Sequence, residues 1–209
     1  FDFHYIDYNE PLKFDIIIYN QDGTWIDAYK ERQLKKWLLK NKPSWLQVDQ
    51  DDISDVMYWA IGVSSEMIDI GAYSGGMKIT FQCLEPWAWS KLKKKKYTSG
   101  GSLNFNLKSV VDFDDYIIYP QIKISVNSGT TISIKNNTTN ELLSISDCTV
   151  GEIIEIDCGK DKLKSSTSRI LLSSWNKQML SIVEGINSFT LTGNFSVDIM
   201  YRLPIRVGG

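Results

Sequence analysis

"WSKLKKKKYTSGGS", residues 89–102, separates two parts of the 209-residue chain that differ in composition and in hydrophobic period. The stretch holds five lysines, Lys91 and Lys93 to Lys96, and ends in a run of Ser and Gly. Runs of small residues are typical of flexible linkers. We therefore predict a Lys-rich interdomain loop here, joining a domain over residues 1–99 to a second over residues 100–209. The alternative is a contact between these lysines and an acidic surface of a neighbouring subunit.

The first part predicts an α+β domain in which one helix packs on antiparallel strands. From Asp27 onward Leu34, Trp37 and Leu38 recur at helical spacing, with Asp27 as the N-terminal cap. Pro43 stops the helical pattern. Alternation of apolar and polar residues and short apolar runs predict the strands. Those strands are residues 12–19, 56–63 and 76–83.

The second part predicts an all-β sandwich. It is rich in Ser, Thr and Asn, shows no helical period, and contains short β-rich runs at the spacing found in sandwiches. Strands are predicted at residues 117–126, 131–135, 141–146, 152–157, 178–183, 186–192 and 196–202. Turn residues separate them at residues 127–129, 136–140, 158–161 and 184–187.

The overall composition argues against two functional classes. The 25 acidic residues slightly outnumber the 23 basic ones, whereas a dedicated nucleic-acid-binding domain usually carries an excess of basic residues. No apolar stretch approaches the roughly 18 residues that a membrane-spanning helix needs. We therefore expect neither sequence-specific nucleic-acid binding nor membrane insertion.

Residues able to carry chemistry are few. The single histidine, His4, is expected to be an ordinary strand residue, so a zinc site has no standard ligand set. The three cysteines, Cys83, Cys148 and Cys158, show no metal-binding spacing and are expected to be reduced thiols in the core. The acidic clusters at residues 49–52 and 112–116 are interpreted as solvated loops. We predict no catalytic residue, no cofactor and no metal, in a protein that is not an enzyme.

The tryptophans are the strongest candidates for an interaction site, because six of the seven lie in the first ninety residues. Tryptophan is enriched at the energetically dominant positions of protein interfaces. Trp87 and Trp89, in the stretch EPWAWSK, either contact another subunit or cap the end of the domain locally. Trp37 and Trp59 are expected in the core, and Trp59 is also retained as a third interface candidate.

The order of these pieces resembles the siphophage distal tail proteins. A helix ending in LKKWLL, a strand YWAIGV and the run GMKITFQCLEPWAW are similar to the first domain of that family. The later stretches YPQIKISVNSGTTISIKNNTTNELLSIS and SIVEGINSFTLTG look like its galectin-like second domain. Family members usually carry several dozen further residues before the helix, so the chain is expected to be part of a longer polypeptide.

This resemblance implies a structural protein of the virion tail or baseplate, synthesised in the cytoplasm of a bacterial host. Members form a homo-oligomeric ring, usually a hexamer, which joins the tail tube protein to the tail tip. The ring anchors tail-associated and receptor-binding proteins. We expect such a ring to assemble through residues 1–99.

The alternative function is a carbohydrate-binding module of a cell-surface-recognition protein. Sugar-binding galectins use a histidine-containing strand and a stacking tryptophan. The predicted β-domain has no histidine, and its one tryptophan, Trp175, lies in the sequence SSWNK outside that pattern. Binding of glycans at the usual galectin face is therefore not expected.

Overall fold

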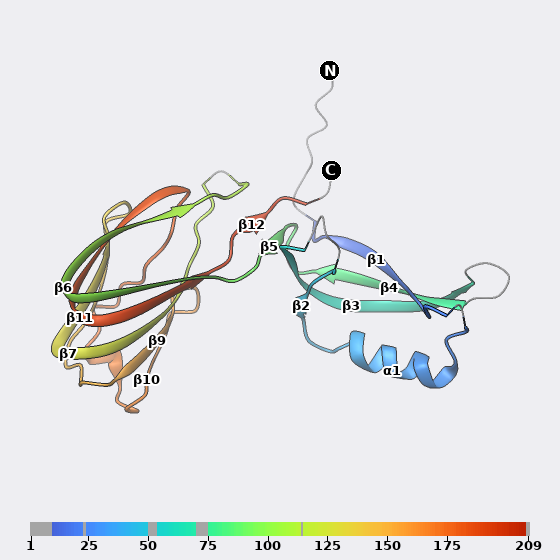
Figure 1. The fold of residues 1–209 in the computed structure, drawn as a ribbon, viewed down its shortest axis with the longest axis horizontal. Coiled ribbons are helices and arrows are strands. Elements are labelled where there is room, and N and C mark those ends of the chain that lie inside the picture. The colour runs from blue at the N-terminus through green and yellow to red at the C-terminus, as the bar shows by residue number, and fades with distance from the viewer. Residues whose placement is uncertain (1–9, 23, 50–53, 70–74, 114, 208–209) are drawn as a thin grey trace, which may run out of the picture. The chain divides into compact units, whose positions relative to one another are not determined.

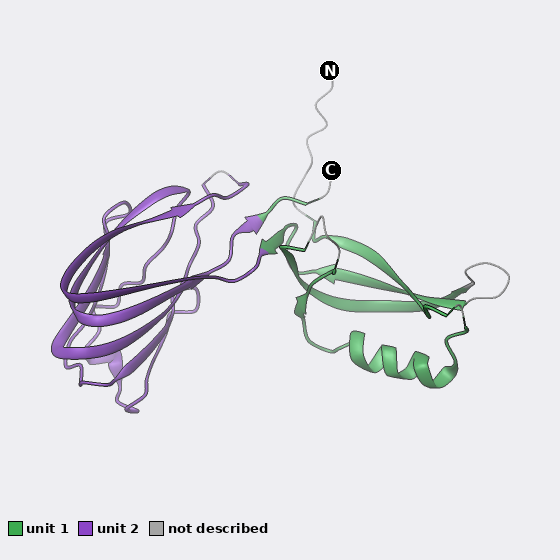
Figure 2. Cartoon of the chain, in the orientation of Figure 1, with its two compact units in different colours: residues 1–89, 205–209 green, residues 90–204 purple. Residues whose placement is uncertain are grey.

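The computed structural model describes residues 10–22, 24–49, 54–69, 75–113 and 115–207 (Figure 1). The chain forms two compact units (Figure 2). Unit 1 comprises residues 1–89 and 205–209, and unit 2 comprises residues 90–204. His4 lies outside the described residues, as do residues 50–52 of the first acidic cluster and Asp114 of the second. No helix in the described ranges is long and apolar enough to span a bilayer.

Unit 1 is built on an antiparallel sheet with strand order β1-β4-β3-β5-β12, and β2 pairs with β3. Its elements are β1 (Lys13–Tyr19), α1 (Ala28–Leu38), β2 (Ser44–Leu46), β3 (Val56–Asp69), β4 (Gly75–Cys83), β5 (Ala88–Ser90) and β12 (Pro204–Ile205). Helix α1 lies along one face of the sheet (Figure 1). The predicted α+β class is confirmed.

Helix α1 begins where the sequence predicts. The side chain of Asp27 accepts a hydrogen bond from the backbone N–H of Lys30 at 2.8 Å, which satisfies one of the free donors of the first turn. Leu34 and Leu38 pack on a core formed by Met77, Ile79 and neighbouring side chains of the sheet. The helix presents only one apolar stripe to that core, so none of its residues is fully buried.

The helix approaches the sheet most closely at Gly62. A Cβ atom at this position would lie 2.8 Å from the carbonyl oxygen of Leu38 and 2.8 Å from Cδ2 of Leu39. The register of β3 against β4 also shifts between Gly62 and Ser64. A glycine is therefore needed here because the end of α1 occupies the space that any side chain would require.

Unit 2 is a second antiparallel sheet with strand order β10-β9-β7-β11-β6, and β8 pairs with β7. Its strands are β6 (Lys93–Ser109), β7 (Gln121–Asn136), β8 (Glu141–Ile145), β9 (Ile153–Asp157), β10 (Lys162–Ser165) and β11 (Gly185–Tyr201), with a 3-10 turn η1 (Leu171–Ser173). The all-β prediction is confirmed, but the strands are fewer and longer than expected. Residues 117–126 and 131–135 were predicted as separate strands, yet β7 runs without a break from Gln121 to Asn136 and includes the predicted turn at residues 127–129.

The three longest strands bend so that the two halves of one sheet face each other. Gly193 in β11 lies at a register shift, with φ of 116°, and a Cβ atom there would lie 2.9 Å from the carbonyl oxygen of Thr131. In β6 the rings of Tyr97 and Phe105, from either side of the bend, stack with centroids 3.6 Å apart. The two halves of the sheet thus pack against each other over one buried cluster, as in a sandwich.

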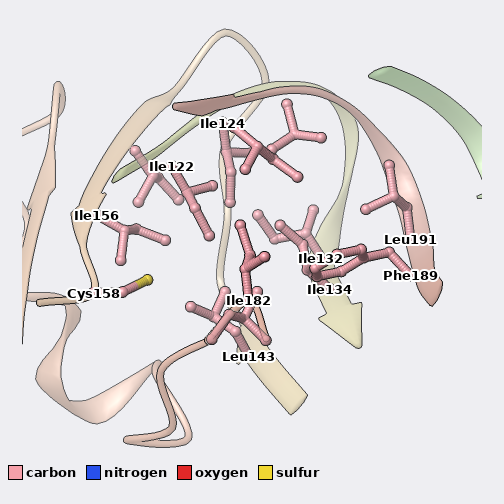
Figure 3. Close-up of a cluster of buried hydrophobic side chains, with 14 of the residues drawn as sticks. Ile122, Ile124, Ile132, Ile134, Leu143, Ile156, Cys158, Ile182, Phe189 and Leu191 are labelled. Carbon is pink, nitrogen blue, oxygen red and sulfur yellow. The ribbon is translucent and has the colours of Figure 1, made fainter. Parts of the chain in front are cut away.

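The buried hydrophobic cluster of unit 2 is mostly aliphatic, with Phe189, Phe195 and Tyr201 among its members. Figure 3 shows side chains from both halves of the sheet meeting in it, among them Ile122, Ile134, Leu143 and Phe189. All three cysteines of the chain are buried and unpaired, as predicted. Burial raises the pKa of the Cys83 and Cys158 thiols to about 11, so both are protonated near neutral pH.

The structure corrects the prediction for the lysine-rich stretch. Lys93 to Lys96 and the following TSGGS lie inside β6, paired with β11, and do not form a linker. Unit 2 begins at Ser90, ten residues before residue 100, where the second domain was predicted to begin. A stretch rich in Gly and Ser can form either a bent strand or a flexible loop. Here it forms a strand because it pairs with β11, which lies about a hundred residues later in the chain. Residues 178–183, predicted as a strand, form only an isolated bridge at Ile182.

Candidate assembly surfaces

The predicted interface pair, Trp87 and Trp89, flanks the buried Ala88 at the start of β5. Both tryptophans are half-buried, and their rings meet edge to face with centroids 6.2 Å apart. Burial raises the pKa of nearby Glu85, while a hydrogen bond from Trp89 acts in the opposite direction. These contacts lie within unit 1, so the pair contributes to local packing. Its role between subunits stays a prediction.

Trp59 is not a core residue, contrary to the prediction. Its neighbours Tyr58 and Ala60 belong to the core of unit 1, so alternation along β3 places Trp59 on the opposite face of the sheet. There it pairs across the strands with Trp45, with ring centroids 4.9 Å apart. Trp59 is half-buried, and Trp45 is 41% exposed. Two aromatic rings thus lie at one end of the face that α1 does not cover.

The face of the sheet that α1 does not cover, which we call the open face, carries a small ionic network at its centre. Lys78 pairs with Glu66, and its ammonium also lies 3.8 Å from the carboxylate of Asp15. Thr80 donates a hydrogen bond to Asp15 at 2.6 Å. A hydrogen bond and the negative charge of Glu66 raise the pKa of Lys78. These groups connect β1, β4 and β3 by polar side-chain contacts on this face.

Two large apolar side chains lie on β1 beside this network. Strand β1 alternates, so Phe14, Ile16 and Ile18 face the core while Ile17 and Tyr19 lie on the open face. Ile17 is 50% exposed and Tyr19 is 63% exposed. The open face therefore has an aromatic end, an ionic centre and an apolar end next to the outer strand.

Helix α1 presents a second surface on the other side of the sheet. Tyr29, Gln33, Lys36 and Trp37 recur at i, i+4, i+7 and i+8, which places them on one stripe facing away from the core. We call these four residues the helix stripe. Tyr29 is 69% exposed and Trp37 is 63% exposed, so the prediction that Trp37 lies in the core is wrong.

The helix stripe was missed because the sequence offers two ways to place Trp37. It lies at i+3 from Leu34, which is on the core face, and at i+8 from Tyr29, which is on the outer face. The pair Leu38 and Leu39 distinguishes the two placements, because both residues pack on the core and Trp37 therefore faces outward.

A groove of about 210 Å³ lies between Trp37, the loop through Lys40 and Lys42, and Trp45.

Unit 2 has a surface of a different character. On the outer face of its sheet Lys123 donates to Glu155 at 3.2 Å, and Lys94 lies 3.1 Å from Asp198. A groove of about 800 Å³ on this face is lined by charged, amide and aliphatic side chains. Trp175, the residue on which glycan stacking would depend, is half-buried on the core and donates its Nε1–H to the carbonyl of Gln178 at 3.0 Å. The described residues of the groove include no aromatic ring.

A family model for phage tail protein N-terminal domains matches residues 1–85, and a model for phage tail C-terminal domains matches residues 87–201. The chain is a phage tail protein. The two matches together span both units. The tail protein has no match among curated proteins.

A solved structure with a similar fold is the Dit protein of phage SPP1, described as a paradigm of the hub adsorption apparatus in phages that infect Gram-positive bacteria. The TM-score is 0.63 at 10% sequence identity, and the match covers 92% of the tail protein and 78% of the SPP1 chain. The resemblance to distal tail proteins, stated from the sequence, is thus confirmed for the fold. Within the described residues, no three His, Cys, Asp or Glu side chains gather in a way that could hold a metal.

Proposed function

We propose that the tail protein forms a homo-oligomeric ring, of six copies by analogy with the distal tail family. The ring joins the tail tube to the tail tip or baseplate and anchors host-recognition proteins, without enzymatic activity. The protein is made in the host cytoplasm and acts in the virion. The observation that carries this proposal is the presence of exposed aromatic and aliphatic side chains on two opposite sides of unit 1.

A ring requires a heterologous interface, in which one surface of each subunit meets a different surface of the next. The open face, with Ile17 and Tyr19, and the helix stripe, with Tyr29 and Trp37, are two such surfaces. They lie on opposite faces of one sheet, so a subunit can use both at once. Trp59, Trp87 and Trp89 remain proposed anchors at the end of the sheet, and their partial burial means that they also support the fold.

The first experiment measures mass in solution. Light scattering on the intact protein is expected to give a single oligomer that dissociates on dilution. Tyr29→Ala/Trp37→Ala and Ile17→Thr/Tyr19→Thr should each weaken it, because truncating a dominant interface aromatic often costs about 2 kcal/mol, or roughly 30-fold in affinity. Ile170→Ser/Leu172→Ser, which alters exposed apolar residues of unit 2, serves as the matched control and should leave the mass unchanged. A protein that stays monomeric at high concentration would contradict the proposal.

The second experiment tests whether the interface is heterologous. Each double variant of unit 1 keeps one surface intact, so a mixture of the two can make one productive contact and should yield heterodimers that cannot extend. An isologous interface, in which one surface meets its own copy, would instead leave the variant that keeps this surface associated on its own, and mixing would add no heterodimer. Circular dichroism and melting curves of each variant show whether a lost assembly reflects the surface or the fold.

A further inference from the structure

Strand β6 is an outer strand of the unit 2 sheet. It pairs with β11 along residues 93–109, and no other described strand pairs with it. An outer strand leaves backbone N–H and C=O groups free along one side, and a long one is a template for pairing with another chain. The strand is 17 residues long, so this side would offer a large surface for association between copies.

The lysines of β6 occupy both faces of this strand. Lys93 lies opposite Tyr201, and Lys95 lies opposite Ile199. Both partners are buried in the core, so Lys93 and Lys95 share the inner face of the sheet, yet they remain exposed. Charged residues on the inner face of an outer strand are a recognised means of preventing further strand addition.

The other two lysines of the run, Lys94 and Lys96, alternate to the outer face. Lys94 pairs with Asp198 at 3.1 Å, and its side chain is still 57% exposed. The opposite outer strand of the sheet, β10, carries Lys162 and Lys164, both exposed. A second copy could extend the sheet by pairing β6 with β6 or β6 with β10. In a register that places these lysines opposite each other, either arrangement brings lysines of the two copies within about 5–8 Å of one another.

We propose that Lys93 to Lys96 keep unit 2 from extending its sheet into a second copy. The lysines disfavour pairing of β6 with β10 of the next copy, which could otherwise continue from copy to copy without limit. Joining β6 to β10 of the next copy uses two different surfaces and leads to fibres when the rotation does not close. This inference concerns unit 2 alone and holds whether or not unit 1 forms a ring.

The test uses the full chain with Lys93→Thr/Lys95→Thr, because threonine is neutral and favours strands. The matched control is Lys123→Thr/Lys135→Thr, which removes the same charge from β7, an inner strand with partners on both sides. Sedimentation velocity shows whether the variants form species larger than those of the wild-type protein. Hydrogen exchange of the peptide covering residues 93–109 reports whether the free side of β6 becomes paired.

We expect the β6 variant to gain at least tenfold in its self-association constant and to exchange more slowly in residues 93–109, while the control behaves as the wild type. About 1 M salt, which shortens the Debye length to about 3 Å, should move the wild-type protein in the same direction. The salt arm needs no substitution, so it remains informative if the variant fails to fold. Unchanged mass and exchange in the variant, or an equal gain in the control, would overturn the proposal.

Discussion

The buried ion pair between Glu152 and Arg169 allows a quantitative prediction for unit 2. The Glu152 side chain is fully buried and accepts hydrogen bonds from Arg169 Nε at 2.7 Å, Ser165 Oγ at 2.5 Å and the Thr149 N–H at 3.0 Å. Arg169 also donates to the carbonyl of Ser146 at 3.2 Å. Burial alone would raise the pKa of Glu152, but the hydrogen bonds from Arg169, Ser165 and Thr149 together lower it below its usual value.

Replacing Arg169 by methionine keeps much of the side chain's apolar contact and leaves the carboxylate buried without its cation. Removing one partner of a buried ion pair typically costs about 3–5 kcal/mol. Arg169 is 21% exposed, so water reaches the site in part and we take the lower end, about 3 kcal/mol. For a unit of this size that corresponds to a fall in melting temperature of roughly 10–15 °C.

The assay is urea unfolding of unit 2 in the intact protein at pH 7 and pH 4, with Lys123→Met as the control. The Lys123–Glu155 pair spans 3.2 Å but is 40% and 54% exposed, so its loss should cost at most about 1 kcal/mol. In the wild type the folded-state pKa of Glu152 is lowered, so its contribution is present above the usual value of 4.5 and is lost below it.

The Arg169→Met variant should show the opposite pH dependence. Without its cation the buried carboxylate is favoured in the protonated form, so the deficit against wild type should shrink between pH 7 and pH 4. Adding Glu152→Gln to Arg169→Met should recover part of the loss at pH 7, because the buried charge is gone. The reasoning is refuted if Arg169→Met costs no more than Lys123→Met at pH 7.

Three further predictions concern unit 1. Asp27→Ala should lose the cap of α1 and about 1 kcal/mol of stability, measured by chemical denaturation. Gly62→Ala should cost about 1–3 kcal/mol in the same assay, because the new Cβ meets the Leu38 carbonyl oxygen at 2.8 Å and the backbone must shift. Burial raises the pKa of Glu85 above 4.5, so stability falls as pH rises through that raised value. Glu85→Gln should therefore be more stable than wild type at pH 7, with the difference closing as pH falls toward 4.5.

Elements specified by nearby residues could be predicted from the sequence. Asp27 and the spacing of Leu34 and Leu38 define α1, because capping and helical packing act within a few residues. Alternation in residues 76–83 defines β4, since a strand with one buried face shows it directly in its composition. Pro120 lies immediately before β7, where it interrupts no ladder, because proline lacks the N–H that a ladder needs.

Features that depend on distant partners could not be predicted. Gly100 and Gly101 were interpreted as part of an interdomain loop, yet they pair with Asn194 and Gly193. Nothing within the stretch TSGGS distinguishes a loop from a bent strand. The interface candidates show the same limit, because which face of α1 holds Trp37 depends on where the sheet lies. A pattern of apolar residues shows that a side chain is suited to burial, but not whether the burial occurs within the chain or against another copy.

The outer strands of the two units differ in the exposed side chains that they carry, and this difference affects which of them can be covered in an assembly. In unit 2, β6 carries four consecutive lysines, whereas in unit 1 β1, an outer strand among those that the structure describes, has Ile17 and Tyr19 exposed. An exposed apolar outer strand is a liability unless something covers it, whereas a lysine-rich one can remain solvated. We infer that β1 and the open face beside it are covered in the assembled tail, while β6 stays free. Protection from hydrogen exchange on assembly should then appear in residues 13–19 and be absent from residues 93–97.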